Sequence, residues 1–156
     1  MDNWVEKIRE KIGHDPIILP HAVTIVLDLD RRLLVEERAD DGYLDFPGGT
    51  LDIGETIEDC AKRELKEETG LIVDIMMPFK TYTGDITKYE YANGDVIYGI
   101  DVVYLVSNYH GDMAPQKEEV KSLKFMRLGD IQGKLSPRNK QILKDLKKFL
   151  WKKNSI

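Results

Sequence analysis

Cysteine is nearly absent from this 156-residue chain, whose one thiol belongs to Cys60. A lone cysteine cannot form an internal disulfide, which favours a reducing compartment. The chain also lacks an apolar run long enough to cross a bilayer, and its first residues, MDNWVEKIREKIG, mix charges where a secretory leader has a basic segment before an apolar one. These absences predict a cytoplasmic protein without membrane attachment.

An excess of positive charge is missing as well. The formal net charge is −5, which argues against general electrostatic binding of nucleic acid backbones. An anionic small molecule would therefore need local cationic groups. No repeat, linker or low-complexity tract is present, and 42% hydrophobic residues are enough for a sizeable core. We expect a single domain over residues 1–156.

Acidic residues are concentrated in the segment GTLDIGETIEDCAKRELKEETGL, which runs from Gly49 to Leu71. If residues 56–69 are helical, Glu64, Glu67 and Glu68 share one narrow face, and each like-charge pair at this spacing costs roughly 0.2–0.5 kcal/mol. A bound cation would turn that cost into a gain. Oxygen ligands without Cys or His indicate Mg²⁺ or Mn²⁺ rather than zinc. A solvated, charge-laced helix that holds no metal is the alternative.

The fixed positions of this segment are similar to the Nudix box, G-x5-E-x7-R-E-U-x-E-E-x-G-U with U aliphatic, and all of them are filled. The chain thus resembles the Nudix hydrolase superfamily. The resemblance implies an α/β fold, a Nudix-type α/β/α sandwich with a mixed curved β-sheet between the box helix and a C-terminal helix. It also implies a Mg²⁺-dependent hydrolase, with Mn²⁺ expected to substitute, that cleaves a pyrophosphate bond in a nucleoside diphosphate linked to another moiety X or in a related nucleotide.

The same resemblance assigns roles to individual residues. The implied metal ligands are Gly49, through its carbonyl, and Glu64, Glu67, Glu68 and Glu119. The implied catalytic residues are Arg63, Glu64, Glu67 and Glu119. The general base stays open between Glu67 and Glu119. Arg63 is expected to hold Glu55 by a forked pair of hydrogen bonds.

Glu119 lies in the loop APQKEEVKSLKFM, where many Nudix enzymes carry one more glutamate that reaches the metal from outside the box. Register against the aromatic Phe125 favours Glu119 over Glu118 as this residue. A solvated acidic loop is the alternative for both.

Two residues outside the box are implied to contact the substrate. Arg38 ends LLVEER, where Nudix proteins often keep a basic residue facing the phosphates, although an ion pair with Asp40 or Asp41 is the alternative. Tyr89 lies at about the distance past the box at which diadenosine polyphosphate hydrolases of the superfamily carry a tyrosine, and a plain sheet-face aromatic is the alternative. The identity of X stays open.

A nucleotide-sensing homologue that binds without cleaving is the second functional hypothesis. Such proteins usually lose box glutamates, and this chain keeps them all.

Helices are expected at both ends of the chain. Residues 1–13 predict an amphipathic helix whose apolar stripe is Trp4, Val5, Ile8 and Ile12. This stripe is expected to pack on the domain, with a homodimer contact or a lid over a nucleobase as alternatives. Residues 136–152 predict a C-terminal helix that Ser136 and Pro137 cap. Cys60 falls on the apolar side of the box helix, so we expect it to be buried rather than catalytic.

Two strand pairings are also expected. The apolar run within residues 16–29 and the run LLVEER, joined by a turn at Asp30 and Arg31, predict a strand pair. Residues 82–91 and 96–106 flank Asn93-Gly94, a two-residue hairpin signal. That turn would place Tyr89 opposite Tyr98 and Tyr91 opposite Val96.

Overall fold

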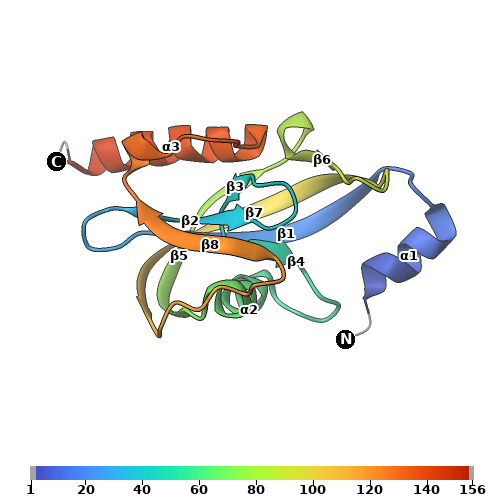
Figure 1. Cartoon of the computed structure of the whole chain (residues 1–156), viewed down its shortest axis with the longest axis horizontal. Helices are drawn as coiled ribbons and strands as arrows, with labels where there is room; N and C mark the ends of the chain where they lie inside the picture. Colours follow the sequence, from blue (N-terminus) through green and yellow to red (C-terminus); the bar gives the residue numbers. More distant parts are fainter. Residues whose placement is uncertain (1–2, 155–156) are drawn as a thin grey trace.

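The strands of the protein form a central layer between two long helices, as the computed structural model shows (Figure 1). The structure describes residues 3–154; residues 1–2 and 155–156, which the domain prediction also covers, lie outside it. The elements are α1 (Trp4–Ile12), β1 (Ile17–Val26), β2 (Leu33–Arg38), β3 (Leu44–Asp45), β4 (Gly48–Thr50), α2 (Ile57–Thr69), β5 (Ile72–Tyr82), η1 (Asp85–Thr87), β6 (Lys88–Glu90), β7 (Val96–His110), β8 (Val120–Met126), η2 (Leu128–Asp130) and α3 (Pro137–Asn154). The helices predicted at both ends are therefore confirmed.

The strands divide between two sheets. The larger sheet has the order β4-β1-β7-β5, with β6 also paired to β7, and the smaller has the order β3-β2-β8. Pairing between β1 and β7 is parallel, whereas the other pairs are antiparallel. The predicted mixed α/β class is confirmed, although two sheets replace the single one expected.

The predicted pairing of the first two strands is wrong. β1 lies in the larger sheet and β2 in the smaller, and their ends are connected by an isolated antiparallel bridge between Leu27 and Leu33 and by a hydrogen bond from the Asp28 N–H to the Arg32 carbonyl. β1 instead runs parallel to β7, from Ile17 beside Ile97 to Val26 beside Val106. Its last five residues are all buried, which suits a central strand covered on both faces.

The hairpin of β6 and β7 is present, but its register differs by one residue from the expected one. Tyr89 lies opposite Ile97 rather than Tyr98, and Val96 lies opposite Glu90 rather than Tyr91. The loop spans residues 92–94, because the N–H of Tyr91 donates to the carbonyl of Asp95. Gly94 has a left-handed φ of 91°, the conformation that closes a three-residue hairpin loop.

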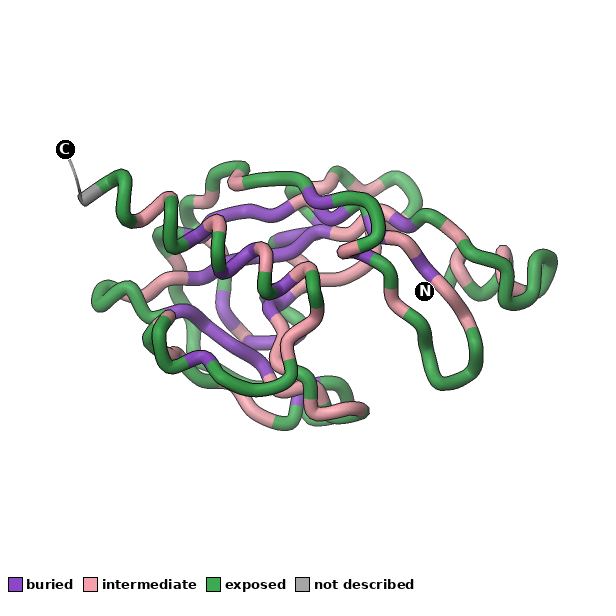
Figure 2. The backbone as a smooth tube through the Cα atoms, turned by 90° about the horizontal axis from the view of Figure 1, so that it is seen from above, coloured by how far each residue is buried: buried purple, intermediate pink, exposed green. Residues whose placement is uncertain are grey.

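Apolar side chains fill the space on both sides of the larger sheet. Helix α3 contributes Ile142 and Leu146 to one cluster, and α2 contributes Cys60 and Ala61 to another against Ala22. Figure 2 shows the buried stretches gathered along the central strands, with exposed loops around them. Burial raises the pKa of the Cys60 thiol to about 12, so Cys60 packs as expected. Within residues 3–154, no helix is long and apolar enough to cross a membrane.

Helix α1 contacts the rest of the protein through polar groups. None of its residues is fully buried. The Trp4 indole N–H donates to the Leu51 carbonyl at 3.0 Å, and the Arg9 guanidinium donates to the Val96 carbonyl at 2.8 Å. His14, just after the helix, lies 2.7 Å from Asp95. Helix α1 is thus attached to the β6–β7 hairpin, on the right of Figure 1.

Asp145 connects α3 to β5 and gives the fold a pH-dependent contact. Its carboxylate accepts from the Tyr82 hydroxyl at 2.8 Å and from Lys80 Nζ at 3.0 Å. Burial alone would raise the pKa of Asp145, but the hydrogen bonds from Tyr82 and Lys80 outweigh burial and lower it. Stabilisation by this group is therefore present above the unfolded-state pKa and is lost as pH falls through the folded-state pKa.

We expect Asp145→Asn to lower the free energy of unfolding by about 1 kcal/mol at pH 7, the usual contribution of such a hydrogen bond. At a pH below the folded-state pKa of Asp145 the difference from wild type should disappear, because the wild-type carboxyl is then protonated too. Urea unfolding at both pH values measures this, and a difference that persists in acid would contradict it.

Candidate active site

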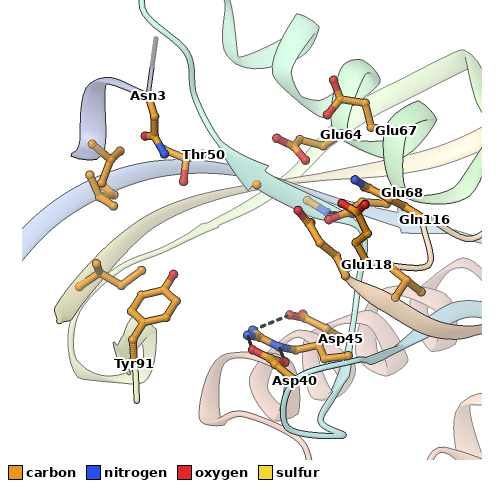
Figure 3. Close-up of a pocket in the computed structure, with 18 of the residues that line it drawn as sticks. Asn3, Asp40, Asp45, Thr50, Glu64, Glu67, Glu68, Tyr91, Gln116 and Glu118 are labelled. Atoms are coloured by element: carbon orange, nitrogen blue, oxygen red, sulfur yellow. Dashed lines mark hydrogen bonds and ion pairs between the residues drawn. The ribbon is translucent and has the colours of Figure 1, made fainter. Parts of the chain in front are cut away.

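A cavity of about 830 Å³ opens between α2, β4, β2 and the loop before β8. Acidic residues dominate one side of it: Glu36, Asp45, Glu64, Glu67, Glu68, Glu118 and Glu119. In Figure 3, Glu64, Glu67 and Glu68 project from α2 near Glu118, with Asn3 and Thr50 on another wall and Tyr91 farther along. The cavity therefore gathers box residues with side chains far from them in sequence.

Helix α2 begins and ends where the box predicts. The Thr56 hydroxyl accepts from the Asp59 N–H, and Gly70 ends the helix in a left-handed conformation. Glu64, Glu67 and Glu68 consequently share a face that lines the cavity. Their surroundings differ, since Glu68 is 6% exposed whereas the Glu67 side chain is 45% exposed.

Strand β4 brings its backbone close to these acids. The Gly48 N–H donates to Glu68 Oε2 at 2.8 Å. A Cβ at Gly49 would overlap the Glu64 carboxylate, so the glycine lets that carboxylate lie directly against the strand. The structure thus places Gly49 beside Glu64 and its neighbour Gly48 beside Glu68.

Arg63 is the cation that organises the box carboxylates. It makes the expected forked pair with Glu55, at 2.7 and 3.0 Å. Its Nη1 also donates to Glu64 at 2.7 Å and to Glu67 at 3.3 Å. The Arg63 hydrogen bond is the main cause that lowers the pKa of Glu55, and Glu55 therefore holds Arg63 at the cavity as a charged partner.

The loop before β8 is fixed to the last turn of α2. The Ala114 N–H donates to the Thr69 carbonyl at 2.8 Å, and the Gln116 N–H donates to the Glu68 carbonyl at 3.1 Å. Both Glu118 and Glu119 line the cavity as a result.

The surroundings of Glu64 affect its ionisation. Burial is the main cause that raises the pKa of Glu64, and the charges of Glu67 and Glu119 raise it further, despite the contact of Glu64 with Arg63.

Glu36 is a cavity residue that the sequence analysis missed. It lies on β2, is 5% exposed, and its Oε2 has no hydrogen-bond partner within residues 3–154. Burial, with the charge of Asp45 added, raises its pKa. Burial and the charge of Glu36 likewise raise the pKa of Glu68. The sequence did contain a signal that could have identified Glu36. It precedes Arg38 by two residues on a strand, and alternate side chains of a strand share a face.

The acidic side chains around the cavity suit a hard divalent cation, since carboxylate oxygens are the ligands that such an ion prefers and one of these oxygens has no partner within residues 3–154. Within the described part of the chain, however, no three acidic or histidine side chains already converge as a metal site. Glu64 and Glu67 contact Arg63, and Glu68 accepts from Gly48. The carboxylates thus fit such an ion by their chemistry, while their present contacts are with Arg63 and Gly48.

Arg38 combines the two arrangements that its position suggested. It lines the cavity and also forms a forked pair with Asp40, at 3.0 and 2.7 Å. Its guanidinium lies over the Tyr89 ring, 5.0 Å from the centroid, and donates to the Tyr89 hydroxyl at 3.1 Å. Tyr89 donates in turn to Asp41 at 3.0 Å.

A second cavity, of about 360 Å³, adjoins the first, and Arg38, Asp45 and Tyr91 line both. Its walls are more apolar and aromatic, with Phe46, Ile86, Tyr89, Tyr91 and Ile97 among them. Arg138 lies on its wall in ion pairs with Asp45 at 2.7 Å and with Asp101 at 3.2 Å. The two cavities offer a charged chamber next to one suited to a flat ring.

Comparison with known proteins agrees with this arrangement. The family model of the NUDIX domain matches residues 19–146. An ADP-ribose pyrophosphatase from Methanocaldococcus jannaschii is 28% identical over 127 residues, which cover 80% of this chain and 70% of the relative. An 8-oxo-dGTP diphosphatase from Escherichia coli is 26% identical over 133 residues, covering 82% and 95% respectively.

The solved structure of a MutT NUDIX hydrolase from Burkholderia pseudomallei superposes with a TM-score of 0.70 at 21% identity, over 83% of this chain and 98% of that one. This likeness establishes the fold, and the family match spans the box and both sheets. The chain belongs to the Nudix family and is a Nudix pyrophosphohydrolase.

Proposed function

We propose that this protein uses Mg²⁺, for which Mn²⁺ can substitute, to cleave a pyrophosphate bond in a nucleoside diphosphate linked to a second moiety X. The observation that carries the proposal is that one cavity beside Arg38 is lined by Gly49, Glu64, Glu67, Glu68 and Glu119. The names of the two relatives support a nucleotide substrate, since ADP-ribose and 8-oxo-dGTP both contain a nucleotide pyrophosphate. We also propose that residues 1–156 form one domain.

The ligands of the cation would be the Gly49 carbonyl and Glu64, Glu67, Glu68 and Glu119. When bound, a divalent cation neutralises phosphate oxygens and lowers the pKa of a water molecule. The side chains of the protein position these ligands and accept the proton. Arg63 restrains the box carboxylates through its contacts with Glu55 and Glu64. Glu67 or Glu119 accepts the proton of the attacking water, and both side chains are exposed enough to reach it.

The adjoining cavities supply a path for the substrate. Arg38 lies where they meet, so its guanidinium can contact a phosphate while its partner Tyr89 faces the second cavity. The aromatic and apolar walls of that cavity fit a nucleobase or another flat ring of the substrate. We propose that the pyrophosphate lies in the acidic cavity and the ring in the second one.

A panel of nucleotides incubated with Mg²⁺ tests the proposed reaction. Wild type should release phosphorylated products from at least one member, and Glu67→Gln should reduce kcat by about 100-fold or more, as the loss of a cation ligand or general base does. Glu58→Gln, an exposed change on the same helix outside the cavity, is the control and should leave kcat unchanged. Equal background turnover in wild type and Glu67→Gln would favour the nucleotide-sensing alternative.

Gly49→Ala tests the close approach of β4 to α2. The new Cβ would displace the Glu64 carboxylate, and a shift of about 1 Å at a catalytic group can cost about 100-fold in rate. We expect that loss in kcat/KM, with circular dichroism still showing a folded protein. Gly129→Ala is the matched control, because a Cβ there meets nothing within 4 Å, and normal activity in Gly49→Ala would argue against the placement of Glu64.

Two substitutions of Tyr89 distinguish the contribution of its ring from that of its hydroxyl group at the proposed substrate site. Tyr89→Ala should raise KM by about tenfold with a small effect on kcat, because it removes the ring over Arg38 and beside the second cavity. Tyr89→Phe keeps the ring and should stay within about threefold of the wild-type KM. Steady-state kinetics on the best substrate of the panel measures both, and unchanged KM in the alanine variant would place the substrate elsewhere.

A further inference from the structure

We infer that Glu36 is an additional ligand of the divalent cation, so that the metal site is closed from β2 as well as from α2. This inference rests on the proposed metal-dependent function. It concerns a residue outside the Nudix box, in a strand of the smaller sheet. It also assigns a role to a buried carboxylate that the proposed reaction does not otherwise use.

The first argument is the orphaned oxygen of Glu36. The residue is 5% exposed, and its Oε2 has no hydrogen-bond partner within residues 3–154. An unsatisfied polar atom in a buried position costs free energy, and native proteins retain one where a ligand supplies the missing contact. Glu36 lines the same cavity as Glu64 and Glu68, so its carboxyl group borders the space in which we propose the cation.

The second argument is the shortage of protein cations around Glu36. Asp45 lies opposite it in the strand register, and Glu64 and Glu119 contribute further negative charge. Nearby Arg38 is held in a forked pair with Asp40. A divalent ion between β2 and α2 would balance this charge.

The other arginines beside the site are also engaged. Arg63 is committed to Glu55 and Glu64, and Arg138 to Asp45 and Asp101. Within residues 3–154 neither forms a hydrogen bond or an ion pair with Glu36, so no arginine partner balances the negative charge of its unpartnered oxygen.

The neighbouring residue Glu37 provides a contrast on the same strand. Its carboxylate accepts from Lys121 Nζ at 2.9 Å and from the Ser122 hydroxyl at 3.4 Å. Glu37 is therefore a satisfied surface glutamate and does not line the cavity. Glu36 and Glu37 thus form a matched pair, identical in chemistry and adjacent in sequence.

A structural consequence follows from the position of Glu36. Strand β2 belongs to the smaller sheet, whereas α2 packs against β1 and β4 of the larger one. A cation held by Glu36 and Glu68 would bridge the two sheets. Metal binding should then stabilise the whole fold against heat, and this stabilisation can be measured without substrate.

Titration of the full chain with Mn²⁺ alone, in the absence of nucleotide, tests the inference. Calorimetry gives the affinity, and thermal unfolding gives the rise in Tm that Mn²⁺ produces. Glu36→Gln should weaken Mn²⁺ binding by about tenfold or more, a size typical of losing even a supporting group of a metal site, and should reduce the rise in Tm. Glu37→Gln should match wild type in both measurements.

The outcomes separate this inference from the proposed function. Absence of Mn²⁺ binding by wild type would overturn the metal-dependent function and this inference together. Equal binding by wild type and Glu36→Gln would overturn the inference alone. If Glu36→Gln fails to fold, Glu36→Asp replaces it, and wild-type affinity in that shortened side chain would count against direct ligation. In crystals soaked with Mn²⁺, the anomalous peak should lie within bonding distance of the Glu36 carboxylate, and a peak away from it would refute the assignment.

Discussion

The close approach of helix α2 to strand β4 is the constraint on which the site depends. The Gly48 N–H anchors the Glu68 carboxylate, and the missing side chain of Gly49 leaves room for Glu64. Because the acids are fixed in this way, they are packed against backbone instead of extending into water. Their negative charge is then concentrated in one partly buried place, where it attracts cations more strongly than it would on the surface.

Positive charge is distributed sparingly around this acidic centre. Arg63, Arg38 and Arg138 each lie between carboxylates at a different point of the two cavities. The protein as a whole carries a net charge of −5, so attraction of an anionic substrate depends on these local groups and on the cation we propose.

The sequence predicts the box helix well because the box encodes local geometry. Thr56 caps the helix, Gly70 ends it, and the periodicity of the acids and of Cys60 separates its two faces. The pairing of strands that lie far apart in the sequence is harder to predict. β1 and β2 follow each other closely but enter different sheets, since that choice depends on β7, which lies far along the chain. The predicted register of the β6–β7 hairpin was wrong by one residue, because Asn93-Gly94 forms part of a three-residue loop instead of a two-residue turn.

Glu36 shows a different limit of sequence reasoning. A glutamate next to another glutamate at the end of a strand suggests exposure, and only the structure reveals that Glu36 is 5% exposed whereas the Glu37 side chain is 31% exposed. The role of each site residue, including Glu119 and Tyr89, is a prediction that rests on position in the two cavities.

Helix α1 is connected to the β6–β7 hairpin through Arg9 and His14, and to the loop after β4 through Trp4. Together, α1 and the hairpin form a wall of the acidic cavity whose sequence is independent of the Nudix box. Substitutions in this wall would therefore reshape the cavity while Glu64, Glu67 and Glu68 stay in place. Under the proposed function, selectivity and chemistry are encoded in separate segments, so in evolutionary terms a gene of this type can acquire a new substrate without first losing its reaction.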